Sequence, residues 1–119
     1  MIPFQTFAHL ANIDLGTPQP KPTSVEGNQV EAAKTLWTSP DGLAEVGIWE
    51  CTAGRFTANR DTNSEICHII YGRVTLHDAD GRTQDVGPGE MLVLPIGWNG
   101  EWTLHDTTRK IYVIKYEKA

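Results

Sequence analysis

Two apolar segments at a fixed separation constrain the fold of this chain more than any other feature. The first runs from Glu65 to Gly72, and the second begins seventeen residues after Gly72, at Gly89, and ends in Pro95-Ile96-Gly97. Both are rich in residues that favour strands, and a strand pattern broken by glycine is typical of a bend or bulge. The two segments therefore predict strands of a compact β-structure.

Turn signals divide the rest of the chain into short strand-like pieces. Ser39-Pro-Asp-Gly42 combines proline, aspartate and glycine in an order that favours a tight turn, and Asp78-Ala-Asp-Gly81 predicts a hairpin. Glu31–Lys34 is the only helix-like stretch, and it is too short to form a helix alone. We expect β-structure from residue 35 onward, with strands at 44–52, 65–77 (broken at Gly72), 82–86, 91–95 and 109–116. Many short strands at this spacing indicate a β-sandwich or barrel.

The N-terminal residues have a different character. Pro18, Pro20 and Pro22 alternate with other residues, which favours extended polyproline geometry. Upstream apolar side chains would let the segment lie along the domain; they are Phe4, Phe7, Leu10 and Leu15. We therefore predict an extended arm over residues 1–30 and a barrel over residues 31–119.

Composition excludes several classes of protein. The 119 residues suit one domain, and the net charge of −5 with no basic cluster argues against nucleic acids and anionic membranes as partners. No apolar run approaches the ~18 residues of a membrane span, and the first residues lack the pattern of a signal peptide. Cys51 and Cys67 match no disulfide or CxxC framework. We expect a cytoplasmic protein with two reduced thiols.

The order and spacing of these segments resemble the small single-domain cupins, of the RmlC-like jelly-roll type. The resemblance covers about residues 35–116 and is nearest to the branch of the ureidoglycine aminohydrolases and ethanolamine-utilisation cupins. It is carried by Gly47–Gly54, Glu65–Leu76, Asp80–Thr83, Gly87–Glu90, Pro95–Trp98, Gly100–Trp102 and Arg109–Ile114. The resemblance implies an all-β, antiparallel double-stranded jelly-roll barrel that commonly pairs as a dimer.

Most cupins of this kind hold a metal with three histidines and the glutamate that corresponds to Glu65. The first two histidine positions fall on Ala58 and Arg60, or on Asn59 and Asp61 if the register differs by one residue. The third position falls on Gly100. Zinc, iron and manganese sites need three or four donors, so we expect no tightly bound metal and no cofactor. A metal held by atypical ligands remains a second alternative.

Strand alternation predicts what faces the barrel interior in place of a metal. If Glu65 points inward, so does Cys67, whereas His68 points outward. The same argument places Trp102 on the face of Gly100, Lys110 with Tyr112, and Trp49 with Cys51. The candidate catalytic residues are Glu65 and Lys110, and the candidate substrate-binding residues are Trp49, Arg60, Cys67, Trp102 and Tyr112.

Each candidate also has a plainer interpretation. Glu65 is either an acid–base group or a carboxylate anchored by Arg60 or Lys110. The aromatic residues either wall a ligand pocket or belong to the core. Cys67 is a nucleophile only if a neighbouring base or cation lowers its pKa, and otherwise it is an inert buried thiol.

Two classes of function follow from these residues. The first is a metal-independent enzyme in which Glu65 performs acid–base chemistry on a small polar compound; the family resemblance suggests a ureido- or amino-type substrate. The second is a non-catalytic module that binds or senses a metabolite. Apolar residues lie on both faces of residues 66–70 and 111–114, more than one small barrel can bury, so we also expect a homodimer.

Overall fold

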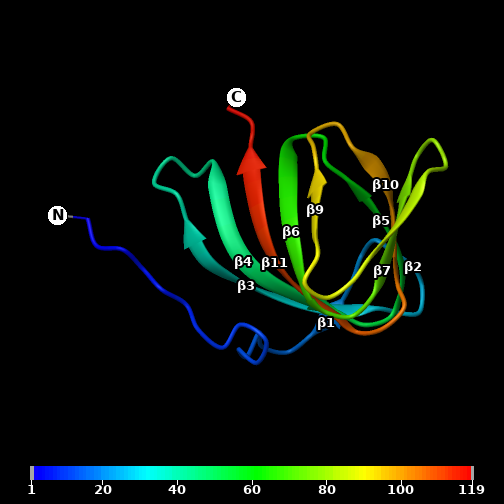
Figure 1. The fold of residues 1–119 in the computed structure, drawn as a ribbon, viewed down its shortest axis with the longest axis horizontal. Coiled ribbons are helices and arrows are strands. Elements are labelled where there is room, and N and C mark those ends of the chain that lie inside the picture. Colours follow the sequence, from blue (N-terminus) through cyan, green and yellow to red (C-terminus); the bar gives the residue numbers. More distant parts are fainter. Residues whose placement is uncertain (1, 119) are drawn as a thin grey trace.

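The computed structural model describes residues 2–118, and within that range the regular structure consists of β-strands (Figure 1). The strands are β1 (Gln19–Pro20), β2 (Ser24–Glu26), β3 (Val30–Thr38), β4 (Ala44–Cys51), β5 (Gly54–Asn59), β6 (Asn63–Tyr71), β7 (Val74–Asp78), β8 (Thr83–Val86), β9 (Met91–Leu94), β10 (Asn99–Leu104) and β11 (Thr108–Tyr116). No helix in this range is long and apolar enough to cross a bilayer.

The strands form two antiparallel sheets that face each other. The larger sheet has the order β1-β3-β4-β11-β6-β9, and the smaller has the order β2-β5-β10-β7-β8. Strands adjacent in a sheet are mostly distant in sequence, because the chain crosses between the sheets; β11, for example, lies between β4 and β6. The predicted antiparallel jelly-roll fold is therefore confirmed.

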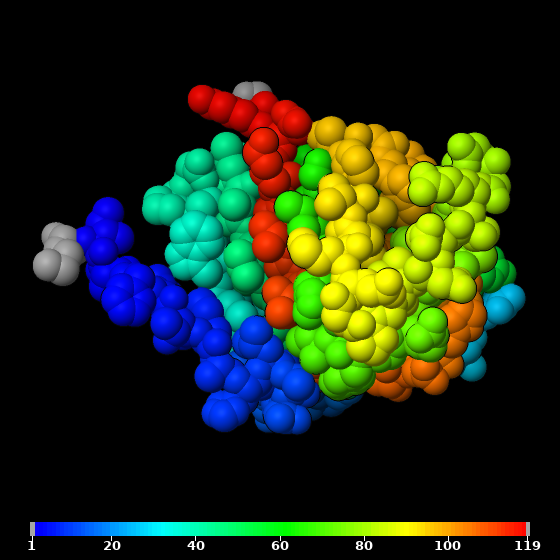
Figure 2. Space-filling model, viewed as in Figure 1, coloured from blue at the N-terminus to red at the C-terminus, as the bar shows by residue number. Residues whose placement is uncertain are grey.

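The start of the chain lies outside this barrel. The residues before β1 include one tight turn, and Figures 1 and 2 show them in blue, projecting from the barrel surface toward the N-terminus. Arg109 on β11 holds the end of this segment, because its Nη1 donates hydrogen bonds to the carbonyl oxygens of Leu10 at 2.9 Å and Ile13 at 3.0 Å. The two short strands β1 and β2 also lie within residues 1–30, for which an arm was predicted.

The expected start of β-structure at residue 35 was too late. Strand β3 begins at Val30 and includes the helix-like residues Glu31–Lys34. Ala33 pairs with Trp49 of β4, and Glu31 pairs with Gln19 of β1 as well as with Cys51. Pairing with β4 along the whole stretch, with β1 on the other side at Glu31, decides its conformation and overrides a local composition that favours helix.

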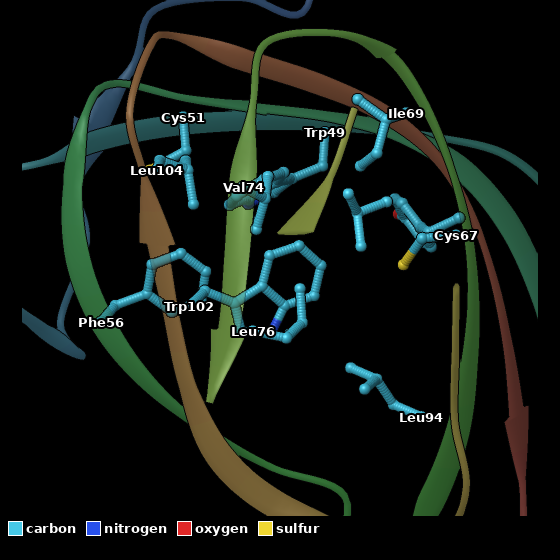
Figure 3. Packing of buried hydrophobic residues seen from close by; sticks show 12 residues of the cluster. Trp49, Cys51, Phe56, Cys67, Ile69, Val74, Leu76, Leu94, Trp102 and Leu104 are labelled. Atoms are coloured by element: carbon cyan, nitrogen blue, oxygen red, sulfur yellow. The ribbon is translucent and has the colours of Figure 1, made fainter. Parts of the chain in front are cut away.

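The interior is filled from both sheets, as Figure 3 shows. On β6 the side chains of Glu65, Cys67 and Ile69 are buried, whereas Ile66 is exposed, which confirms the predicted alternation. Three aromatic rings form the centre of the core: Phe56 stacks on Trp102 with ring centroids 5.7 Å apart, and Trp49 packs edge-on to both. These contacts stabilise the strands that hold the charged residues described next.

Candidate functional site

A cavity of about 200 Å³ opens against the inner face of the larger sheet. It is lined by Ala33, Trp49, Arg60, Glu65, Lys110, Tyr112 and Ile114. The lining thus contains five of the seven residues singled out in the sequence. The other two, Cys67 and Trp102, are buried in the adjacent core and do not line the cavity.

Neighbouring strands bring these side chains together. Strand β11 lies between β4 and β6, with Lys110 paired to Trp49 on one side and to Ile69 on the other. Arg109 faces outward and Lys110 faces the cavity, because consecutive residues of a strand point to opposite faces of the sheet. Tyr112 has room for its ring because Gly47 lies opposite it; a Cβ at Gly47 would overlap the phenol.

Glu65 and Lys110 form a buried ion pair at the base of the cavity. Lys110 Nζ donates a hydrogen bond to Glu65 Oε2 at 3.0 Å, and the two residues are only 4% and 6% exposed. The Lys110 ammonium also lies 4.4 Å from the ring centroid of Trp49 and 4.3 Å from that of Trp102. The lysine is thus fixed by one carboxylate and two aromatic faces.

Arg60 supplies a second cation to the same carboxylate. Its Nη1 lies 3.8 Å from Glu65 Oε1 and donates a hydrogen bond to Asn63 Oδ1 at 2.8 Å. The backbone at Arg60 is held by the turn after Pro95, since its N–H donates to the carbonyl of Trp98 and its own carbonyl accepts from Gly97. Each of the two anchors considered for Glu65 from the sequence is therefore in place.

The charges around Glu65 determine its protonation. Burial alone would raise the pKa of Glu65, but the positive charges of Lys110 and Arg60 and the hydrogen bond from Lys110 outweigh it, so the pKa is lowered from 4.5. For Lys110, burial would lower the pKa, but the charge of the Glu65 carboxylate and the hydrogen bond to it hold the pKa above its ordinary value. At neutral pH the site contains a carboxylate and an ammonium group.

The two thiols are poor nucleophiles in this setting. Burial raises the pKa of Cys67 to about 12 and that of Cys51 to about 11, despite the nearby positive charge of Lys110. Both remain protonated at neutral pH, and the thiolate is the reactive form. The geometry favours the inert interpretation of Cys67.

The residues present do not fit the metal site of other cupins. Ala58 packs against the core and Arg60 lines the cavity, so the inward pair at the first two histidine positions is Ala58 and Arg60. The third position has no room for a side chain, because a Cβ at Gly100 would overlap the His77 carbonyl oxygen and the Trp98 ring. Among residues 2–118 no three His, Cys, Asp or Glu side chains are grouped as metal ligands would be. Two fixed cations beside Glu65 also oppose a metal ion by charge repulsion.

Some residues at the site could not be identified from the sequence. Ala33 and Ile114 line the cavity, but both side chains are aliphatic, so nothing in the sequence marks them as site residues. Glu31 accepts hydrogen bonds from Trp49 Nε1 at 2.8 Å and from Lys21 Nζ at 2.9 Å, and thereby fixes the indole that walls the cavity. In the sequence, only the general ability of a carboxylate to pair with a cation could have suggested this role of Glu31.

Comparison with known proteins places the chain in a family. The model of the EutQ-like cupin domain matches residues 38–112, which is more than half of the chain. The chain belongs to the EutQ-like cupin family. No curated protein matches it significantly.

Solved structures agree with this assignment. The EutQ protein of Clostridium difficile is 27% identical, with a TM-score of 0.65 over 74% of this chain and 69% of that one. A putative ethanolamine utilization protein Q from Salmonella typhimurium is 21% identical, with a TM-score of 0.67 over 87% of this chain and all of that one. A DUF861 family protein from Thermotoga maritima is 32% identical, with a TM-score of 0.52 over 55% and 73% of the two chains. The predicted resemblance to ureidoglycine aminohydrolases is not tested by these matches and stays a prediction.

Proposed function

We propose that this EutQ-like cupin binds a small polar compound of the amino or ureido type in the cavity and acts on it by metal-independent acid–base chemistry. Glu65 is the base, and Lys110 is its electrostatic partner. The observation that carries the proposal is the buried Glu65–Lys110 pair in the wall of a cavity large enough for a small molecule.

The protonation of the pair assigns the roles. Because the pKa of Glu65 is lowered, this residue is ionised before the reaction and accepts a proton from the substrate. Lys110 is a fixed ammonium that stabilises negative charge developing on the substrate, and it costs little reorganisation because the two rings and Glu65 already position it. Abstraction of a proton from a substrate, as in an isomerisation or a hydrolysis, needs these two elements.

The suggested class of compound rests on the relatives. The Salmonella protein is named as a putative ethanolamine utilization protein, which points to amino compounds. The cavity volume of about 200 Å³ suits a small metabolite. The aromatic walls formed by Trp49 and Tyr112 suit a flat or apolar part of such a molecule.

A non-catalytic binding module is the second candidate, and one observation favours it. The hydrogen bond from Lys110 and the charge of Arg60 lower the basicity of Glu65, and a weaker base abstracts protons less readily. In this alternative, Glu65 and the cations recognise a metabolite and release it unchanged. Both candidates predict that the compound binds, but only the enzyme converts it.

The cellular setting and assembly are also proposals. Cys51 and Cys67 are both free and buried, in keeping with a cytoplasmic protein. On the outer face of the larger sheet, Ile66 pairs with Val93, and both side chains, like that of Met91, remain exposed; the exposed fractions are 38%, 59% and 64%. A second copy of the chain would cover this apolar surface in a homodimer.

The experiment measures turnover and binding for four compounds: ethanolamine, glycine, urea and N-carbamoylglycine. NMR spectra of the compounds in deuterated buffer report both hydrolysis and proton exchange, and protein-detected NMR reports binding. We expect Glu65→Asp, which withdraws the carboxylate while keeping its charge, to abolish turnover. Glu65→Gln should do the same.

The matched control is Glu50→Gln. Glu50 is also a partly buried carboxylate paired with an arginine, Arg109 at 2.9 Å, but it lies on the outer face of the same sheet. This control should react as the wild type does. Binding without turnover in the wild type would establish the binding module. Full activity in Glu65→Asp and Glu65→Gln would refute both candidates, because each assigns the central role to Glu65.

A further inference from the structure

The charges that line the cavity do not balance. Arg60 and Lys110 contribute two positive charges and Glu65 contributes one negative charge, so the lining carries one net positive charge. Two other carboxylates on β3 and β4 are already engaged: Glu31 pairs with Lys21, and Glu45 accepts a hydrogen bond from Tyr116. Neither of these carboxylates lines the cavity. A net charge in a partly desolvated site favours a ligand of the opposite sign.

Arg60 is the cation whose charge and hydrogen-bond donors are only partly used. Lys110 is neutralised by a hydrogen bond to Glu65 at 3.0 Å, whereas Arg60 approaches the same carboxylate only to 3.8 Å. Its one side-chain hydrogen bond among residues 2–118 leaves from Nη1 to Asn63. Its Nε is buried and has no hydrogen-bond partner in the described part of the chain.

A buried N–H of a guanidinium group without an acceptor is costly, and most such groups in proteins have a partner. In arginine, Nε–H and one Nη2–H point in the same direction, and together they match the two oxygens of a carboxylate. A ligand carboxylate at Nη2, which makes no hydrogen bond among residues 2–118, would therefore supply the missing charge, and a turn of the guanidinium group would bring the shielded Nε–H to the same carboxylate.

We propose that, among such amino and ureido compounds, the cavity selects those that carry one carboxylate, whose two oxygens bind the Nε and Nη2 edge of Arg60 once the guanidinium group turns toward the cavity, with the rest of the molecule against Trp49 and Tyr112. This proposal rests on the proposed function, since it names the chemical class of compound that the same site takes. It adds a specificity residue to the site. Glu65 and Lys110 then face the part of the ligand that lies deeper in the cavity.

The test uses three probes that share one ring and differ in charge: benzoate, benzamide and benzylamine. Binding is followed by NMR through the indole N–H of Trp49, because this residue lines the cavity and the wider hollow on the other side of Arg60 does not include it. We expect benzoate to bind about ten- to a hundredfold more tightly than benzamide, as charge-assisted bidentate hydrogen bonds are worth that factor. Benzylamine should bind most weakly.

Arg60→Gln should remove the preference for benzoate and leave the affinity for benzamide unchanged. Arg55→Gln is the matched control, because Arg55 lies on β5, which ends one residue before Arg60, but pairs with Glu26 and Glu101 away from the cavity. It should keep the preference. If Arg60→Gln does not fold, Arg60→Lys serves in its place; it keeps the charge but loses the paired donors and should weaken benzoate binding severalfold.

Three results would overturn the proposal: benzamide equal to benzoate, benzylamine preferred over both, or no response of Trp49 to any of the three. None of them bears on the acid–base role of Glu65, which the Glu65→Asp and Glu65→Gln measurements test separately. Loss of turnover in those variants together with a preference for benzylamine would mean that the proposed function holds and that the ligand is a cation.

Discussion

Replacing Lys110 by methionine isolates the energetic role of the buried ion pair. Methionine keeps an unbranched side chain of similar length and removes the charge. Glu65 would then be a buried carboxylate with only Arg60, 3.8 Å away, as a countercharge. Breaking a buried pair by removing one partner costs about 3–5 kcal/mol, and Arg60 places this case near the lower value. The lost contacts with two aromatic faces are partly replaced by the methionine sulfur.

We therefore expect Lys110→Met to lower the free energy of unfolding by about 3 kcal/mol at pH 7. The entropy of unfolding of a domain of this size is about 0.25 kcal/mol/K, so the melting temperature should fall by roughly 12 °C. Urea denaturation followed by tryptophan fluorescence measures the first quantity, and calorimetry measures the second. Lys115→Met, on the same strand but exposed, is the control and should change stability by less than about 0.5 kcal/mol.

The dependence on pH separates loss of the pair from simple loss of packing. In Lys110→Met the cost arises from an ionised Glu65, so it should shrink when this carboxyl is protonated in acid. The double variant Glu65→Leu/Lys110→Met removes both charges and should be about as stable as the wild type or more so. A loss under 1 kcal/mol in the single variant, or a loss that does not change with pH, would refute this reasoning.

The remaining predictions concern the whole molecule. Because the pKa of Glu65 is lowered in the folded state, the ion pair contributes fully to the free energy of unfolding above the unfolded-state pKa of 4.5, and this contribution is lost as the pH falls through the lower folded value. The raised pKa of Lys110 extends the contribution to alkaline pH. Denaturation at a series of pH values checks both statements. Cys51 and Cys67, with pKa values raised to about 11 and 12, should not react with a thiol-specific reagent until the protein unfolds, and fast reaction of the native protein would contradict their burial. Light scattering should give twice the 13.2 kDa chain mass at micromolar concentration, and Met91→Lys should shift it toward a monomer; a monomeric wild type would exclude the dimer. Elemental analysis of untagged protein after dialysis should find no stoichiometric transition metal, and stoichiometric zinc, iron, manganese or nickel would disprove metal independence.

Local patterns predicted the strands and the direction of their side chains. The spacing of Glu65 and Gly72 identified β6 and its inward face, and a period of two was enough to place Lys110 and Tyr112 together. The same rule left two registers open for the empty histidine positions. The structure selects Ala58 and Arg60, because β5 is anchored against Gly100 and Trp102 of β10.

Long-range geometry was beyond the reach of these patterns. The 3.0 Å contact between Lys110 and Glu65 depends on the register in which β11 pairs with β6, and a local sequence does not encode that register. Ala33 entered the cavity wall because pairing with β4 made a strand of a helix-like segment. Lys21 lies 4.3 Å from the ring centroid of Phe56, a contact between residues far apart in the chain that no motif predicted.

The most direct test of the account is a ¹³C NMR titration of the Glu65 side-chain carboxyl, with and without whichever of ethanolamine, glycine, urea and N-carbamoylglycine binds most tightly. We expect Glu65 to titrate below 4.5, because Lys110 and Arg60 stabilise the carboxylate, and its resonance to shift when the compound enters the cavity, while that of Glu50 on the outer face stays unchanged. A Glu65 that titrates above 4.5 and does not respond to the compound would contradict the assignment of an ionised base in a ligand-binding cavity.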